Sequence, residues 1–210
     1  MRMKKVIVDL QYFPPVEYFS ALGGFDKIIL EAGEYFVKQT YRNRCYILGP
    51  HQVEKLVVPV QKGRSKIRMK DLRIDHSEDW QKKHWRAIET CYSKSAYFIH
   101  YKDELYAVFS KKRNFLFDMN YDILTLLLKF LRKSWNIKVN SEYCEETEGL
   151  IDLRGVIIPK TAWNHRDFIT PVNYYQTFGN TFVENLSIID LIFCEGPNAS
   201  SYVTFDGKRE

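Results

Sequence analysis

The sequence predicts an α/β fold, a single domain over residues 1–210 in which a mixed, Rossmann-like sheet is flanked by helices. The first observation behind this prediction is a strand–turn–helix–strand opening, with apolar runs at 4–10 and 26–32 around a helical stretch at 15–22. The second is a shift of periodicity, which divides the chain into a strand-rich, a helical and a mixed C-terminal region, at about 1–75, 76–135 and 136–210.

The first three elements have clear boundary residues. Pro14 and Pro15 end the first strand, because proline cannot donate a hydrogen bond to a strand partner. Pro15 also fits the first turn of the following helix, and Gly23–Gly24 stop that helix. The apolar run that follows is the second strand.

A β-hairpin comes next, from 35–48 and 54–62 around a turn at "GPHQ". The segment 64–74 adds a possible further strand. From 62 to 70, basic residues occupy every second position and would share one face of a strand: Lys62, Arg64, Lys66, Arg68 and Lys70. A solvated edge that deters aggregation is favoured over a phosphate-binding surface.

Four further helices are predicted, three in the helical region and a fourth near the C-terminus. Asp118 or Asn120 is expected to cap the third helix, and Ser187 and Asp190 have the spacing of a capping box. Between the last two helices we expect a loop-rich region over 140–170 and a last strand over 170–178. The four predicted helices span 78–92, 97–112, 118–134 and 184–197.

Composition narrows the function. Hydrophobic residues make up 45% of the chain, yet no window has the roughly 18 uncharged apolar residues of a membrane span, so we expect a cytoplasmic protein with no membrane span. The net charge of +5 fits a small anionic ligand and argues against nucleic acid as a partner. The four cysteines form no CxxC pair, so neither a zinc site nor any other metal site is predicted.

Arg42 and Arg44 are the sharpest candidates for ligand binding. At this spacing they share one face of a strand, with Asn43 opposite. Two adjacent guanidinium groups repel each other unless an oxyanion or a carboxylate lies between them. A bound anion and a pairing with internal Asp or Glu are about equally favoured.

His84 lies on the inward face of its helix, with Trp80, Ala87, Ile88 and Cys91. A buried core histidine is favoured there over a catalytic one. For Asp118 and Asn120 ordinary capping is favoured over a role in a site. Tyr174 and Gln176 share a strand face and suit sugar or base hydroxyls, or equally the rim of the protein. The sequence contains no Walker loop, GxGxxG, HExxH or GxSxG motif, and the cofactor remains unknown.

Six segments, in this order, resemble the WbqC-like family of bacterial proteins: "QYFPPVEYFSAL", "YFVKQTYRNRCYILGP", "LVVPV", "DWQKKHWRAIETCY", "FLFDMN" and "PVNYYQTF…ENLSIIDLIFCEGP". The likeness spans residues 8–198. It departs from the family pattern where Trp-Gly-Tyr-Phe normally follows the first prolines, and a "YLSG" stretch before the last strand is absent. By motif, the resemblance marks Gln11, Pro14, Tyr18, Asn43, Arg44, His84, Asp118, Asn120, Gln176, Ser187 and Asp190 as positions of interest.

The resemblance implies a role in O-antigen and other surface-polysaccharide biosynthesis, with transfer of an acyl or aminoacyl (glycyl) group to an amino sugar. In that hypothesis Arg42 and Arg44 hold phosphate or carboxylate oxygens of an anionic or sugar-nucleotide ligand. His84 takes a proton, Asp118 orients His84 or the acceptor, and an aromatic lip covers a sugar face, formed by Tyr12, Phe13 and Tyr18. The alternative is a non-catalytic sugar- or nucleotide-binding module of a biosynthetic complex.

Overall fold

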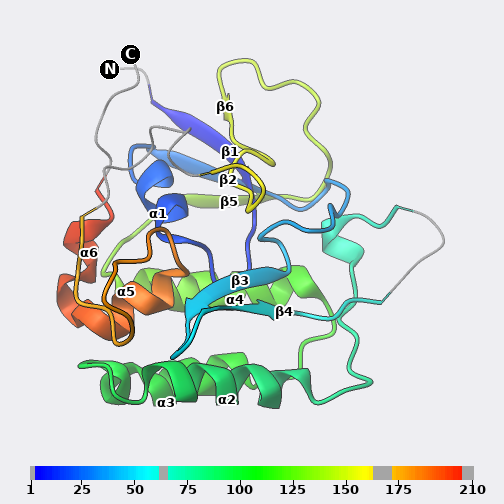
Figure 1. The fold of residues 1–210 in the computed structure, drawn as a ribbon. Helices are drawn as coiled ribbons and strands as arrows, with labels where there is room; N and C mark the ends of the chain where they lie inside the picture. Colours follow the sequence, from blue (N-terminus) through cyan, green and yellow to red (C-terminus); the bar gives the residue numbers. More distant parts are fainter. Residues whose placement is uncertain (1–2, 62–65, 163–171, 205–210) are drawn as a thin grey trace.

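A parallel sheet of four strands forms the centre of the fold (Figure 1). The computed structural model describes residues 3–61, 66–162 and 172–204. The strands are β1 (Lys5–Asp9), β2 (Lys27–Glu31), β5 (Ile137–Asn140) and β6 (Ile151–Asp152), in the order β5-β2-β1-β6. Numbered along the chain within this sheet, the order is 3-2-1-4, as in the first four strands of a Rossmann fold. The predicted α/β class is therefore confirmed.

The register of the sheet brings polar residues together at one edge. Asp9 at the end of β1 lies opposite Glu31 at the end of β2, which lies opposite Asn140 at the end of β5. On the other side of β1, Ile7 is paired with Asp152 of β6. Because all four strands are parallel, their carboxyl ends meet, and each ends on a polar residue.

The strand interiors are apolar because the sheet is covered on its faces. Val6, Ile7 and Val8 are fully buried in β1. Helix α1 (Val16–Leu22) connects β1 to β2, starts after Pro15 and ends at Gly23. The strand–helix–strand opening predicted from the sequence is confirmed.

The predicted hairpin is also confirmed, and it forms a sheet of its own. Strands β3 (Arg44–Leu48) and β4 (Val53–Val57) are antiparallel, with Arg44 opposite Val57 and Leu48 opposite Val53. Arg42 lies in the turn before β3, so the prediction that Arg42 and Arg44 share a strand face is wrong.

The remaining helices close the core. Figure 1 shows α2 and α3 on the side of the molecule away from the parallel sheet. Helix α4 buries a long apolar face, with Leu116, Ile123 and Leu127 fully enclosed, and α5 is buried along nearly all of its length. The helices are α2 (Trp80–Tyr92), α3 (Phe98–Phe109), α4 (Leu116–Phe130), α5 (Ile188–Glu195) and α6 (Ala199–Tyr202), with 3-10 turns η1 (Met69–Asp71) and η3 (Gly196–Asn198).

Two predicted caps are wrong. Because α4 begins at Leu116 after Phe115, Asp118 lies in its first turn and Asn120 lies inside the helix. Ser187 does precede α5, but its side chain makes no capping bond and its Oγ donates instead to the Phe13 carbonyl at 3.0 Å. Asp190 accepts from side chains of other segments, described below, so the two residues form no capping box.

Two predicted strands are replaced by other structure. In the segment 64–74, Arg68 makes one isolated bridge to Tyr35 and η1 follows directly, while Lys62 and Arg64 lie outside the described residues. Arg68 and Lys70 both contact the Glu142 carboxylate, at 2.9 and 2.8 Å. Of the predicted strand 170–178, residues 170–171 lie outside the described residues and the rest is loop.

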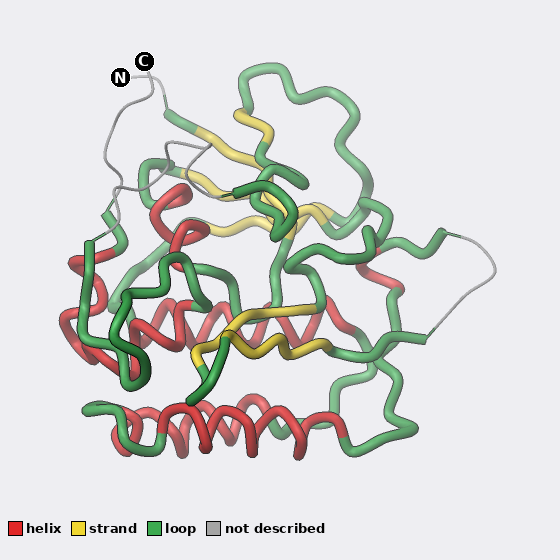
Figure 2. Tube along the Cα trace, viewed as in Figure 1, coloured by secondary structure: helices red, strands yellow, loops and turns green. Residues whose placement is uncertain are grey.

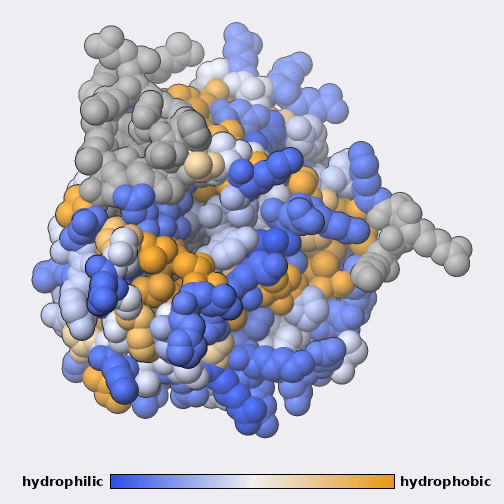
Figure 3. All heavy atoms as spheres, in the orientation of Figure 1, coloured by the Kyte–Doolittle hydropathy of each residue, from blue (hydrophilic) through white to orange (hydrophobic). Residues whose placement is uncertain are grey.

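Between β5 and α5, most of the described residues lie in loops (Figure 2). On the face shown in Figure 3, hydrophilic residues predominate and hydrophobic residues lie among them in patches. Among the described residues, no helix has the length and apolar character that crossing a membrane requires.

The buried face of α4 is expected to carry a large share of the stability. Replacing Leu127 by Ala should lower the free energy of unfolding by about 2–5 kcal/mol, because a cavity is left in a fully enclosed site. Urea denaturation of the purified variant measures this change. Lys129→Ala on the same helix is the control, since Lys129 is exposed and its ion pair is with Glu104, which is also exposed. Equal effects of the two substitutions would contradict this account of α4.

Candidate functional site at the carboxyl edge of the parallel sheet

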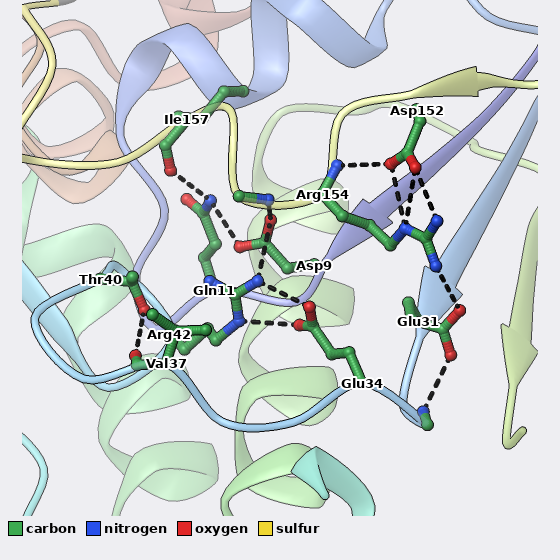
Figure 4. Close-up of polar contacts among 12 residues, drawn as sticks. Asp9, Gln11, Glu31, Glu34, Val37, Thr40, Arg42, Asp152, Arg154 and Ile157 are labelled. Carbon is green, nitrogen blue, oxygen red and sulfur yellow. Dashed lines mark hydrogen bonds and ion pairs between the residues drawn. The ribbon is translucent and has the colours of Figure 1, made fainter. Parts of the chain in front are cut away.

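The strand order reverses between β1 and β6, and this places a candidate site at their carboxyl ends. In open parallel sheets, ligands bind in the crevice at such a switch point. Four segments meet there: the loop after β1, the loop after β2, the turn before β3 and the loop after β6 (Figure 4). Each contributes charged or amide side chains.

Asp9 is the centre of this arrangement. Its buried carboxylate accepts a hydrogen bond from the Gly155 backbone at 2.7 Å and one from Gln11 Nε2 at 3.1 Å. Gln11 Nε2 also donates to the Ile157 carbonyl at 3.0 Å. The Tyr18 hydroxyl donates to the Asp9 carbonyl at 3.1 Å. Asp9 and Gln11 thereby hold the loop after β6 against the end of β1.

Arg42 is buried in the same place, with 1% of its surface exposed. Its guanidinium donates to both carboxylate oxygens of Glu34, each at 2.7 Å, and its Nη2 lies 3.5 Å from Asp9 Oδ1. Burial raises the pKa of Glu34, and the hydrogen bonds from Arg42 oppose that rise. The predicted alternative that Arg42 pairs with internal acidic residues is thus what the structure shows.

Several polar atoms around Arg42 are buried without a hydrogen-bond partner. Such atoms are rare in folded proteins and indicate where a water or a ligand group belongs. Asn120 Nδ2 donates to the Arg42 carbonyl at 2.8 Å, and Asn43 Nδ2 donates to the Val58 carbonyl at 2.9 Å. The amide oxygens of both asparagines are left without a hydrogen-bond partner. The unpartnered atoms of this region are Gln11 Oε1, Arg42 Nη1, Asn43 Oδ1, Arg44 Nε and Asn120 Oδ1.

A second ion pair closes the edge beside Arg42. Arg154 contacts Asp152 at 2.6 Å and Glu31 at 3.2 Å, and it donates to the Cys144 carbonyl at 2.8 Å. The hydrogen bonds that Arg154 donates to Asp152 keep the pKa of Arg154 above its ordinary value. In the described portion of the chain, no group of three or more His, Cys, Asp or Glu side chains is arranged to hold a metal ion.

Sequence reasoning missed Asp9, Glu31, Glu34 and Arg154. For Asp9 and Glu31 a signal was present, because each is an acidic residue directly at the end of an apolar strand. Carboxyl ends of neighbouring parallel strands meet at one edge, so these two could have been placed together. For Glu34 and Arg154, which lie in loops, the sequence contains no comparable signal.

His84 and Asp118 are not brought together. His84 is buried on α2, where its Nδ1 lies 2.9 Å from the Tyr12 hydroxyl and its ring packs edge-on against Trp80. Burial lowers the His84 pKa to about 4, although a hydrogen bond to the Val57 backbone opposes this. Asp118 is exposed on α4, and no described hydrogen bond or ion pair joins it to His84. The structure therefore does not place Asp118 where it would orient His84.

The loop "QYFPP" is packed inside the protein. The rings of Tyr12, Phe13 and Tyr18 are fully buried, so the expected aromatic lip is absent from the surface. The Pro14 carbonyl accepts a hydrogen bond from the Ile188 backbone at 2.9 Å, which fixes the loop to the start of α5. These residues therefore belong to the buried core that supports the candidate site.

Tyr174 and Gln176 are brought together around another residue, Asp190. The buried carboxylate of Asp190 accepts from Tyr174 at 2.6 Å, from Tyr92 at 2.8 Å and from Gln176 at 3.0 Å. Burial raises the pKa of Asp190, and the three hydrogen bonds oppose the rise. This cluster fastens the loop before α5 to the helices and makes no contact with Arg42 among the described interactions.

The low pKa of His84 predicts a pH dependence of stability. Between pH 4 and 6.5 the unfolded chain binds a proton that the folded chain does not, so the free energy of unfolding rises with pH in that window. The contribution of neutral His84 to the free energy of unfolding is fully present above about pH 6.5. It is lost as the pH falls toward 4, and the full loss is about 3 kcal/mol. Urea denaturation at pH 7 and pH 4.5 should show a larger loss for the wild type than for His84→Gln, which cannot be protonated there.

The control for this experiment is His51→Gln, because His51 is exposed in the turn between β3 and β4. Its pH dependence should match that of the wild type. If His84→Gln also matches the wild type, the buried neutral state of His84 is refuted.

Comparisons with known proteins support the family resemblance that the sequence motifs indicated. The chain is 27% identical over 229 aligned positions to the "Uncharacterized protein Rv1507c" of Mycobacterium tuberculosis (strain ATCC 25618 / H37Rv), an alignment that covers 97% of this chain and 99% of that relative. No solved structure matches the chain significantly. The WbqC-like protein family matches residues 11–165 and 161–202, and the chain belongs to this family.

Proposed function

We propose that this protein is a transferase of bacterial surface-polysaccharide biosynthesis, which binds an anionic sugar or sugar nucleotide at the carboxyl edge of its parallel sheet. The reaction is transfer of an acyl or aminoacyl (glycyl) group to an amino sugar. One observation carries the proposal. Buried Arg42 keeps one nitrogen, Nη1, without a partner, and Gln11, bonded to the same Asp9, keeps an unpartnered amide oxygen.

These two atoms complement the groups of such a ligand. A guanidinium nitrogen donates to a phosphate, carboxylate or hydroxyl oxygen, and an amide oxygen accepts from a hydroxyl or an amine. Glu34 and Asp9 fix the orientation of Arg42, so its free nitrogen has a set direction. A preorganised donor of this kind supports binding with little loss of side-chain entropy.

The transfer itself needs a nucleophile and a leaving group. The nitrogen of the amino sugar attacks the acyl carbon, the bond from that carbon to its carrier breaks, and the carrier leaves with the electron pair. The proton that the amine loses passes to the departing carrier, so that a thioester donor is released as a thiol. His84 is a poor proton acceptor because burial lowers its pKa to about 4, so in this proposal His84 positions Tyr12 and the loop "QYFPP".

The second candidate is a non-catalytic sugar- or nucleotide-binding module of a biosynthetic complex. The separation of His84 from Asp118 favours it, since no described contact lets Asp118 orient His84 as a proton acceptor. Turnover distinguishes the two candidates. A transferase acylates a UDP-linked amino sugar when supplied with acyl or glycyl thioesters, which mass spectrometry detects, whereas a binding module leaves both compounds unchanged.

Ligand binding is expected to depend on the forked shape of the Arg42 guanidinium. UDP-sugars should raise the melting temperature of the wild type by several degrees, since a ligand that binds only the folded state stabilises it. Arg42→Lys keeps the charge but loses the two-point geometry, and its affinity for the UDP-sugar should fall at least about tenfold. Thermal shift measured over a range of UDP-sugar concentrations gives both affinities.

Arg68→Lys is the matched control, because Arg68 is an arginine paired with one exposed carboxylate, Glu142. It should bind UDP-sugars like the wild type. Circular dichroism confirms that both variants are folded. An Arg42→Lys protein with unchanged affinity, or a wild type that no UDP-sugar stabilises, would refute the proposed ligand site.

A further inference from the structure

The two unpartnered atoms on which the proposed ligand site depends are enclosed by the protein. Arg42 Nη1 and Gln11 Oε1 are both buried, and so is the carboxylate of Asp9, which contacts both side chains. A ligand therefore reaches these atoms only when a segment that covers the site moves aside.

The turn after β6, residues 153–157, covers this site. The Gly155 backbone donates to Asp9 Oδ1 at 2.7 Å, and the same oxygen lies 3.5 Å from Arg42 Nη2. The Ile157 carbonyl accepts from Gln11 Nε2 at 3.0 Å (Figure 4). The turn thus lies directly on the carboxylate and the amide that surround Arg42.

The turn has a shape of its own and open space outside it. Its Val156 N–H donates to the Leu153 carbonyl at 3.2 Å, and Gly155 has a φ of +65°, which glycine adopts without strain. A Cβ at Gly155 would meet no atom of the described residues within 4 Å. Leu153 and Ile157, at the two ends, are buried, whereas Gly155 is exposed. The centre of the turn can therefore lift outward as a unit between two anchored ends.

Arg154 fastens the turn to the neighbouring segments. Its Nη1 donates to Glu31 at 3.2 Å and to the Cys144 carbonyl at 2.8 Å. Its bonds to Asp152, two residues earlier, stay within β6 and its turn. The Glu31 carboxylate also accepts from the Gly33 and Cys144 backbones, at 2.9 and 3.0 Å, so it keeps hydrogen bonds when Arg154 leaves. Release of the turn consequently breaks few contacts.

We infer that the turn 153–157 is a lid on the ligand site and that Arg154 is the positioning residue that latches it closed. Opening breaks the bond from Gly155 to Asp9 and the bonds from Arg154 to Glu31 and Cys144. Ligand entry waits for this opening. The inference rests on the proposed function for the ligand beneath the lid, whereas the movement of the turn is a property of the fold alone.

Hydrogen exchange of the protein without ligand tests the lid. In Arg154→Gln the amides of residues 153–157 should exchange at least about tenfold faster than in the wild type, because the bonds to Glu31 and Cys144 are lost. Arg154→Lys keeps the charge but not the fork of donors, so its increase should be smaller. Exchange in α4 should stay at the wild-type rate in both variants, which shows that the fold is intact. Mass spectrometry of proteolytic fragments measures these rates.

The rate of ligand association tests the gating. In stopped-flow experiments with a fluorescent UDP-N-acetylglucosamine, the association rate should reach a plateau at high ligand concentration, since lid opening becomes limiting. The plateau should rise about tenfold in Arg154→Gln, whereas a residue that only supports the fold would leave it unchanged. Arg68→Gln is the control, because Arg68 is paired with the exposed Glu142, and it should match the wild type in both experiments.

Exchange at the wild-type rate in Arg154→Gln would overturn the inference. An association rate that rises linearly with ligand concentration and is the same in that variant would also overturn it. If no UDP-sugar binds the wild type, the proposed function fails, and exchange measured without ligand still decides whether the turn opens. If UDP-sugar stabilisation depends on Arg42 but exchange at 153–157 does not depend on Arg154, only the lid fails.

Discussion

The buried ion pair between Arg42 and Glu34 is the constraint on which the carboxyl edge of this fold depends. Burying an arginine that exposes 1% of its surface costs free energy unless carboxylates and hydrogen bonds compensate its charge. Here Glu34 takes two of its N–H groups and Asp9 lies 3.5 Å away. The turn before β3, the end of β1 and the loop after β2 must therefore meet at one point. Asn120 connects α4 to the same point, because its Nδ2 donates a hydrogen bond to the Arg42 carbonyl.

The same carboxylate that faces Arg42 also fixes the other side of the edge. Asp9 binds the Gly155 backbone and the Gln11 amide, and Gln11 binds the Ile157 carbonyl. The loop after β6 has little strand pairing of its own, since β6 contains only two residues. Side-chain contacts to Asp9 and the Arg154 ion pairs hold it instead. The polar cluster thus holds the segments of this edge together. The unpartnered atoms of Gln11 and Arg42 take no part in those contacts.

The sequence predicted those features that local periodicity and turn residues control. The opening strands, α1 between Pro15 and Gly23, the hairpin and the four main helices all follow from such patterns. Contacts between segments distant in the chain could not be predicted from such local patterns. Arg42 was identified, but its partner Glu34 was not, and Asn120 was read as a cap because a helix start and a buried contact look alike in a sequence. The predicted strand at 170–178 failed because Tyr174 and Gln176 turn inward to Asp190.

Two buried carboxylates with raised pKa, Glu34 and Asp190, have different surroundings and therefore different uses. Asp190 receives three hydrogen bonds from neutral donors, so both of its oxygens accept from the protein itself. Glu34 is paired with a cation that retains a free donor. Arg42 Nη1 is buried and has no hydrogen-bond partner, whereas both oxygens of Asp190 already accept hydrogen bonds from protein groups. The unused donor at the carboxyl ends of the strands is therefore the feature that supports our proposal of a ligand there.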